Sequence, residues 1–238
     1  DEPASPEPVD PERFAQALRR ICGWMPPGRA TRYAAMILEH AGSFEVDPFL
    51  VAALVYREGR CRYDAENGDS GSGIGLTLID TRMYWEHVRH GHLRYRVRQN
   101  GQWIERDRVV DRFPFNGPRL RVPEANVYFA AALLSMWRDQ HASVDEAFDS
   151  VTHRHFVSHF VWGDRVRSDR QEDRVLTERR RLLEYYGQPE SATPIVWGGG
   201  TFGCPLNGCP RVISSYLGSE REGGERHHRG VDLESLPG

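Results

Sequence analysis

Glu58 stands at the end of an almost wholly apolar run, FLVAALVYRE. In a helix, Leu50, Leu54 and Glu58 share one face, so the carboxyl would lie against apolar neighbours. The negative end of the helix dipole also disfavours a second negative charge there. Both effects are expected to raise the pKa of this carboxyl. They would make it a general acid of the kind that glycoside cleavage requires, whereas the alternative is a Glu that ends a helix and points into water.

Two further carboxylates, Asp69 and Asp80, follow on or beside the Gly-punctuated stretch AENGDSGSGIGL. An inverting glycosidase pairs its acid with a carboxylate that holds a water about 6.5–9.5 Å away. We therefore expect Asp69 and Asp80 to position water. The alternative is that Asp69 is a turn residue and that Asp80 caps a helix.

Arg57-Glu58 and the segment GDSGSGIGLTLIDTR (68–82) resemble the active site of goose-type lysozymes and, more broadly, of soluble lytic transglycosylases. The resemblance covers residues 30–187 in outline and 46–82 in motif detail. It implies that Glu58 is the acid, that Asp69 and Asp80 position water, and that no cofactor is needed. The implied substrate is peptidoglycan, cut at the β-1,4 bond between MurNAc and GlcNAc. Residues expected to bind substrate are Gly75, Leu76, Tyr84, Trp85 and Phe160, with Tyr84 and Trp85 as cleft walls.

The chain departs from the family pattern at three places. Gly59 replaces a Ser, Thr77-Leu78 replaces Met-Gln, and Phe160-Val161-Trp162-Gly163 stands where Tyr-Asn-x-Gly is expected. Hydrolysis and lytic transglycosylation therefore both stay open, with the two Asp residues favouring hydrolysis. A peptidoglycan-binding module with weakened catalysis, and a hydrolase of chitin-like polymers, are the other readings.

The surrounding elements predict an α+β fold that is mostly α. Asn100-Gly101 inside 92–110 is a strong hairpin signal, and the Gly-rich loop suggests a small β element. We expect a lysozyme-like helical domain in which the inserted hairpin forms a rim of the glycan cleft. Helices are expected over 11–20, 30–41 and 48–58, from Pro123, from Ser143, and from Ser168 to Gly187.

The amino-acid composition changes after Gly187, which suggests a domain boundary. We assign a flexible tail to 1–10, the glycan-cleaving domain to 11–187, a linker to 188–210 and a β-rich fragment to 211–238. Within the fragment, RVISS and HRGVDL resemble the opening of lysostaphin-type zinc endopeptidases. That resemblance implies that His228 and Asp232 are zinc ligands of an incomplete site, since the family's third ligand comes from a later His-x-His segment.

Composition narrows the partners and the compartment. The net charge of −3 gives no reason to expect nucleic acid, although all 31 basic residues are Arg. No apolar run reaches the roughly 18 residues of a membrane helix. Four cysteines predict the disulfides Cys22–Cys61 and Cys204–Cys209, which fit a periplasmic or secreted protein.

Overall fold

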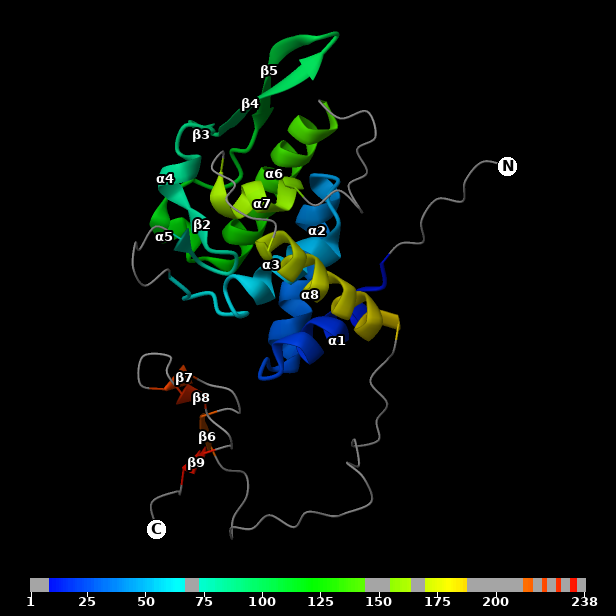
Figure 1. Cartoon of the computed structure of the whole chain (residues 1–238), viewed down its shortest axis with the longest axis vertical. Coiled ribbons are helices and arrows are strands. Elements are labelled where there is room, and N and C mark those ends of the chain that lie inside the picture. The colour runs from blue at the N-terminus through cyan, green and yellow to red at the C-terminus, as the bar shows by residue number, and fades with distance from the viewer. Residues whose placement is uncertain are drawn as a thin grey trace, which may run out of the picture. The chain divides into compact units, whose positions relative to one another are not determined.

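A computed structural model describes residues 9–66, 73–143, 155–163 and 170–187, together with short strands between 212 and 234. The chain divides into two compact units, Asp1–Glu190 and Ser191–Gly238, and the division falls inside the segment predicted as a linker. The first unit is mainly helical with small antiparallel sheets (Figure 1). The predicted α+β, mostly α fold class is confirmed.

Proline and aspartate define where several helices of the first unit begin. Pro11 and Pro48 occupy first helical positions, and the preceding Asp10 and Asp47 accept backbone hydrogen bonds of 2.8 Å as N-caps. The helix predicted from Pro123 is also confirmed, whereas the start predicted at Ser143 leads into residues outside the described ranges. The helices are α1 (Pro11–Cys22), α2 (Pro27–Ser43), α3 (Pro48–Arg57), α4 (Thr81–Tyr84), α5 (Gly117–Leu120), α6 (Pro123–Ala142), α7 (His155–Trp162) and α8 (Arg170–Gly187).

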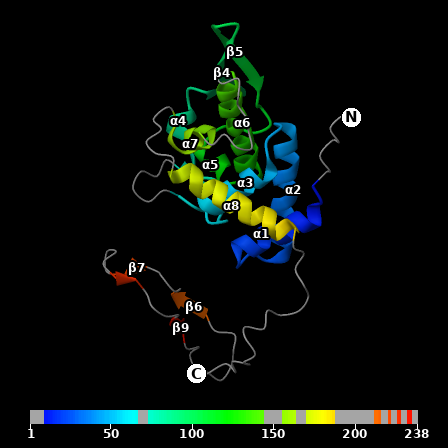
Figure 2. The same ribbon diagram turned by 45° about the vertical axis from the view of Figure 1, so that its right-hand side comes forward.

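Helices α3 and α6 form the centre of the unit. Every residue of α3 from Phe49 to Val55 is buried, as the unbroken apolar sequence predicted, and α8 packs along this helix (Figure 2). In α6, all side chains from Ala125 to Trp137 are buried. None of the described helices is both long enough and apolar enough to cross a membrane.

Two small sheets complete the first unit. Strands β1 (Gly73–Ile74) and β2 (Ile79–Asp80) form the predicted small β element. Strands β3 (Val88–Arg89), β4 (His92–Gln99) and β5 (Gln102–Val109) form the other sheet, in that order. The predicted hairpin turn at Asn100-Gly101 is confirmed, and both residues have the positive φ that such a turn requires.

The second unit contains two short antiparallel pairs among its described residues. Strand β6 (Val212–Ser215) pairs with β9 (Asp232–Glu234), and β7 (Glu220–Arg221) pairs with β8 (Arg226–His227). Strand β6 lies within the RVISS motif.

Candidate active site

Glu58 is the C-cap of α3, so the helix ends where the sequence predicted. Its backbone N–H donates to the Leu54 carbonyl at 2.9 Å, and the residue as a whole is half-buried. The helix that carries it is fixed at its other end by the Asp47 cap and by an ion pair between Asp47 and Arg179 of α8. The Glu58 carboxyl is therefore carried by a buried helix whose N-terminal end is held in place.

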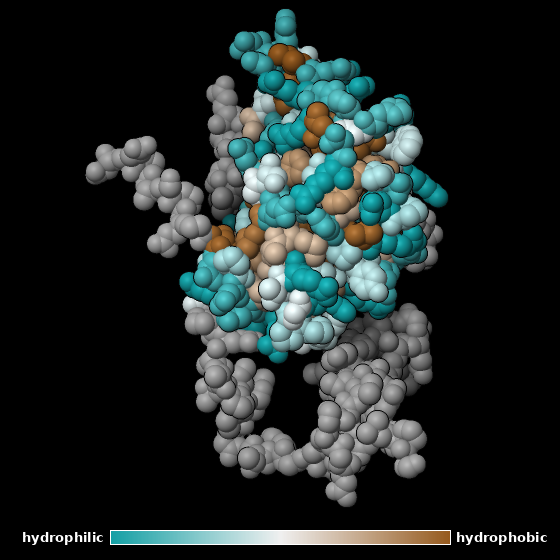
Figure 3. Space-filling view, turned by 180° about the vertical axis from the view of Figure 1, so that it is seen from behind, coloured by the Kyte–Doolittle hydropathy of each residue, from teal (hydrophilic) through white to brown (hydrophobic). Residues whose placement is uncertain are grey.

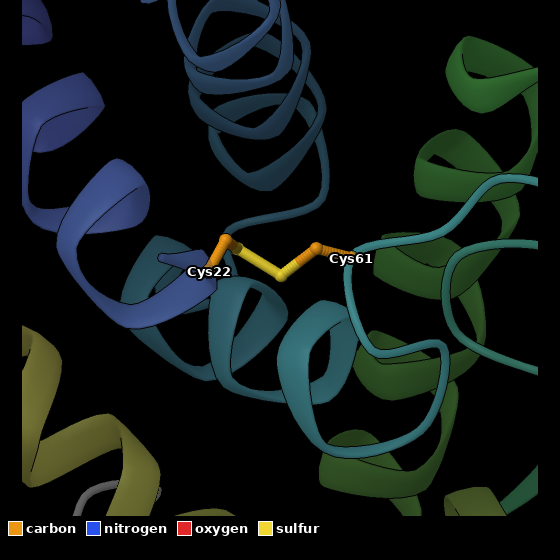
Figure 4. The surroundings of a disulfide bond; sticks show 2 residues. All are labelled: Cys22 and Cys61. Atoms are coloured by element: carbon orange, nitrogen blue, oxygen red, sulfur yellow. A yellow bond between two sulfur atoms is a disulfide. The ribbon is translucent and has the colours of Figure 1, made fainter. Parts of the chain in front are cut away.

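The chain turns sharply after Glu58 and is then covalently tied to α1. Arg60 and Cys61 both have positive φ values, of 52° and 61°, which non-glycine residues adopt only when the surroundings impose them. Cys61 donates its backbone N–H to Val55 at 3.0 Å and forms the predicted disulfide with Cys22 at the end of α1 (Figure 4). The pairing of Cys204 with Cys209 lies outside the described residues.

Gly59 explains one of the departures from the family sequence. A Cβ atom built on Gly59 would lie 2.1 Å from the Leu76 carbonyl oxygen and 2.6 Å from its carbon. The residue after Glu58 therefore presses directly against the backbone between β1 and β2. This position therefore has no room for any side chain.

The turn between β1 and β2 is held by the fully buried Asn126 of α6. Its Oδ1 accepts from both the N–H and the hydroxyl of Thr77, at 2.9 and 2.8 Å. Its Nδ2 donates to the carbonyls of Ile74 and Leu120, at 2.8 and 3.0 Å. Every hydrogen-bonding group of this amide is used, so α6 fixes the turn that Gly59 touches. Gly75 has a φ of 79° and lies so close to Asn126 that a Cβ there would clash.

Asp80 ends β2 and caps α4. Its Oδ1 accepts from the backbone N–H groups of Arg82 at 2.8 Å and Met83 at 3.2 Å. Among the described residues these are its only hydrogen bonds, and the side chain is half-buried. Asp80 therefore caps a helix, which was the alternative to a catalytic role, and both of these hydrogen bonds use Oδ1.

Glu58 and Asp80 are linked through one short, rigid path. Gly59 contacts Leu76 in the β1–β2 turn, and Asp80 pairs with Gly73 at the open end of the same hairpin. The two carboxylates are thus carried by elements that share one contact. Asp69 lies outside the described residues.

Four of the five predicted substrate-binding residues are buried. The Tyr84 side chain is fully inside, where its hydroxyl donates to the Phe160 carbonyl at 2.8 Å and accepts from Trp137 at 2.9 Å. Leu76, Phe160 and Gly75 are likewise covered. The prediction that Tyr84 forms a cleft wall is wrong, and the side chains of Leu76 and Phe160 are also not available to a glycan. The Tyr84 hydroxyl instead joins α4 to Trp137 of α6 and Phe160 of α7.

Trp85 is the exception, because 53% of it is exposed. It borders a pocket of about 610 Å³ whose walls include Phe113, Pro114 and Phe115. Aromatic faces of this kind suit the apolar faces of sugar rings. Phe113 and Phe115, which line this pocket with Trp85 and are half-buried, were missed in the sequence, although the Phe-Pro-Phe segment was a usable signal. Asn126 was also missed, and its signal was a lone amide in an apolar helix.

The described residues contain no group of three or more His, Cys, Asp or Glu side chains placed to hold a metal ion. Of the two residues predicted as zinc ligands, His228 lies outside the described residues and Asp232 begins β9. The pairing of Ser215 with Asp232 places β6 beside β9.

A scan against protein-family models and a search of curated proteins each gave no match to this chain.

Proposed function

We propose that this protein cleaves the glycan strands of peptidoglycan, with Glu58 as the general acid. The observation that carries the proposal is the position of Glu58 at the end of α3. It ends a buried helix, and the next residue touches the backbone of the hairpin that delivers Asp80. A glycosidase needs its two carboxylates held at a fixed separation, and the contact between the elements that carry Glu58 and Asp80 supports such an arrangement.

In the proposed reaction, Glu58 protonates the leaving oxygen of the MurNAc–GlcNAc bond. Asp80, whose Oδ1 is used by the α4 cap, orients a water through Oδ2, together with Asp69. The presence of these carboxylates favours hydrolysis over intramolecular attack by the MurNAc 6-hydroxyl. The pocket beside Trp85 would hold a sugar ring. The bacterial periplasm or the outside of the cell is the compartment where such a substrate is found.

Turbidity loss of purified cell walls tests the acid. Glu58→Gln should lower the rate by about 1000-fold, as expected for removal of a general acid. Glu66→Gln is the matched control, because this exposed carboxylate of the following loop pairs with Arg121 and has no assigned catalytic role. Equal losses in both variants would refute the assignment of Glu58.

A catalytic role of Asp80 can be tested separately from its role as the cap of α4. Asn at position 80 can still cap α4 through its amide oxygen but has no charge. Asp80→Asn should therefore keep the thermal stability and lose activity.

Digestion in heavy-oxygen water should label a new reducing-end MurNAc in the wild type. An unlabelled 1,6-anhydro product would show transglycosylation and leave Glu58 as the acid.

A binding module without catalysis is the second candidate, and the use of Asp80 as a helix cap favours it. Leu78 stands where the resembled family has an amide that lines the cleft, and the loss of that amide also favours a binding module. In this case wild type and Glu58→Gln would bind purified peptidoglycan equally, and neither would release any product.

The second unit is proposed to be the start of a zinc endopeptidase-like β domain. An imidazole and a carboxylate, His228 and Asp232, are suitable zinc donors. Catalytic zinc sites use three protein ligands, so these two do not make a complete site, and no reaction step is assigned to them. Equilibrium dialysis of the chain against zinc should give only weak binding, which His228→Ala abolishes.

A further inference from the structure

The β4–β5 hairpin is anchored to α6 by one face and projects past the end of that helix. Tyr95 donates its hydroxyl to Asp139 at 2.8 Å, and Arg108 donates to the Ser135 hydroxyl at 2.7 Å. At the end of α6, the Arg98 backbone N–H donates to the Ser143 hydroxyl at 2.8 Å. The strands continue to the turn at Asn100-Gly101, which is the outermost point of the unit in both ribbon views (Figures 1 and 2). The hairpin tip, residues 98–106, is therefore a protrusion.

The tip exposes large apolar side chains on both of its faces. Trp103 is 60% exposed and Ile104 is 38% exposed. Because successive strand residues point to opposite faces, these two neighbours lie on different sides of the ribbon. Trp103 pairs with Arg98, and Ile104 pairs with Val97. Viewed from behind, strongly hydrophobic surface at this end of the molecule is surrounded by hydrophilic side chains (Figure 3).

The hairpin is also basic, in a chain whose net charge is −3. Its two carboxylates are already engaged, since Asp107 lies 3.3 Å from Arg94 and Glu105 lies 3.6 Å from Arg96. The arginines of strands β4 and β5 are Arg94, Arg96, Arg98, Arg106 and Arg108.

The two arginines nearest the tip have only neutral partners among the described residues. Arg98 donates to the Gly101 carbonyl at 3.5 Å, and Arg106 donates to the Gln99 side chain at 3.3 Å. Arg98 shares a face with Trp103, and Arg106 shares the other face with Ile104. Each face of the tip thus carries one apolar side chain and one arginine without a carboxylate.

We propose that the hairpin tip docks this protein on an anionic lipid surface, beyond the glycan-cleaving function proposed above. Trp prefers the boundary between water and acyl chains, and Arg binds lipid phosphates there. A deformable interface surrounds an inserted tip and covers both faces at once. A rigid partner or a stacked sugar ring covers only one face and would leave either Trp103 or Ile104 in water. A pocket of about 790 Å³ between the hairpin and α6 is lined by Arg98 and Arg106, whereas neither Trp103 nor Ile104 lines it.

Flotation of the full chain with lipid vesicles tests this proposal. The wild type should float with vesicles of phosphatidylglycerol mixed with phosphatidylcholine, and much less with phosphatidylcholine alone. Arg98→Gln and Arg106→Gln should each weaken the partition about fivefold at low salt, because a cation near an anionic membrane contributes about 1 kcal/mol. Trp103→Ser combined with Ile104→Ser should abolish it.

Two controls make the result specific to the tip. Trp24→Ser removes a Trp that is 50% exposed, from the turn after α1, and should leave flotation unchanged. Arg94→Gln removes an arginine that pairs with a carboxylate and should have the smaller effect. Failure of the wild type to float, or equal flotation by the Trp103/Ile104 variant, would overturn the proposal. Loss of binding to purified peptidoglycan in that folded variant, without vesicle binding by the wild type, would instead make the hairpin a rim of the glycan cleft.

Discussion

The segment around Glu58 and the β4–β5 hairpin are fastened to the same helical core in opposite ways. The turn after Glu58 is held by a disulfide, by backbone contact with Leu76 and, through that turn, by the buried amide of Asn126. The hairpin is held by one face only, and strand β5 exposes nearly its whole length. The turn after Glu58 is thus held by contacts from several elements, whereas the hairpin leaves most of β5 exposed.

The largest effect should come from removing the disulfide. Cys22→Ala combined with Cys61→Ala should lower the free energy of unfolding by about 4 kcal/mol, because the bond closes a long loop in the unfolded chain. The sequence separation of the two cysteines is 39. Urea unfolding measures the loss. A loss below about 1 kcal/mol would mean that noncovalent contacts alone hold the Glu58 turn.

Gly59→Ala should have the next largest effect, since the new methyl group would overlap the Leu76 backbone. We expect a loss of about 3 kcal/mol in unfolding free energy, at the upper end for overpacking. Cell-wall clearing should fall with it. Gly42→Ala is the matched control because Gly42 is helical and has open space around it, so the variant should be as stable as the wild type or slightly more stable.

Asn126→Ala should lower the unfolding free energy by about 2 kcal/mol, because it leaves buried groups of Thr77, Ile74 and Leu120 without partners. Hydrogen exchange should show faster opening of the β1–β2 turn and no change in the hairpin. Equal acceleration in both regions would contradict the view that they are anchored independently.

Tyr95, which anchors the hairpin to α6, should make the stability of the protein depend on pH in the alkaline range. Burial, and secondarily its hydrogen bond to Asp139, raise the pKa of Tyr95 to about 12. An unfolded tyrosine ionises near pH 10, so this stabilisation is complete below that pH and is lost as pH rises toward 12. Tyr95→Phe should cost about 1 kcal/mol at neutral pH and remove this alkaline dependence. A wild-type unfolding free energy that stayed constant across this range would contradict the assignment.

Substitution at the hairpin tip should have the smallest effect on stability. Trp103→Ser removes an exposed side chain and should change the unfolding free energy by less than about 0.5 kcal/mol. Thermal unfolding followed by circular dichroism measures it. A loss as large as that of Asn126→Ala would show that Trp103 packs in the folded protein and is not held out for a partner.

The sequence by itself determined the local elements. An unbroken apolar run after Asp47-Pro48 predicted a buried α3, and Asn100-Gly101 placed the hairpin turn. These features depend on periodicity, caps and turn chemistry, which act between residues close in the chain. The disulfide Cys22–Cys61 was also predicted, from the even number of cysteines and from the position of these two residues in separate helical stretches.

Only the tertiary structure decided what the residues near Glu58 do. Tyr84 follows the Gly-rich loop directly and looked like a cleft wall, yet a hydrogen bond to Phe160 turns it into the core. Gly59 looked like a lost serine, yet the approach of Leu76 excludes any side chain. Asn126 is far from the loop in sequence and fixes it in space. Whether a side chain is buried or exposed depends on packing between segments that are distant in the sequence. Local sequence carries no record of that packing.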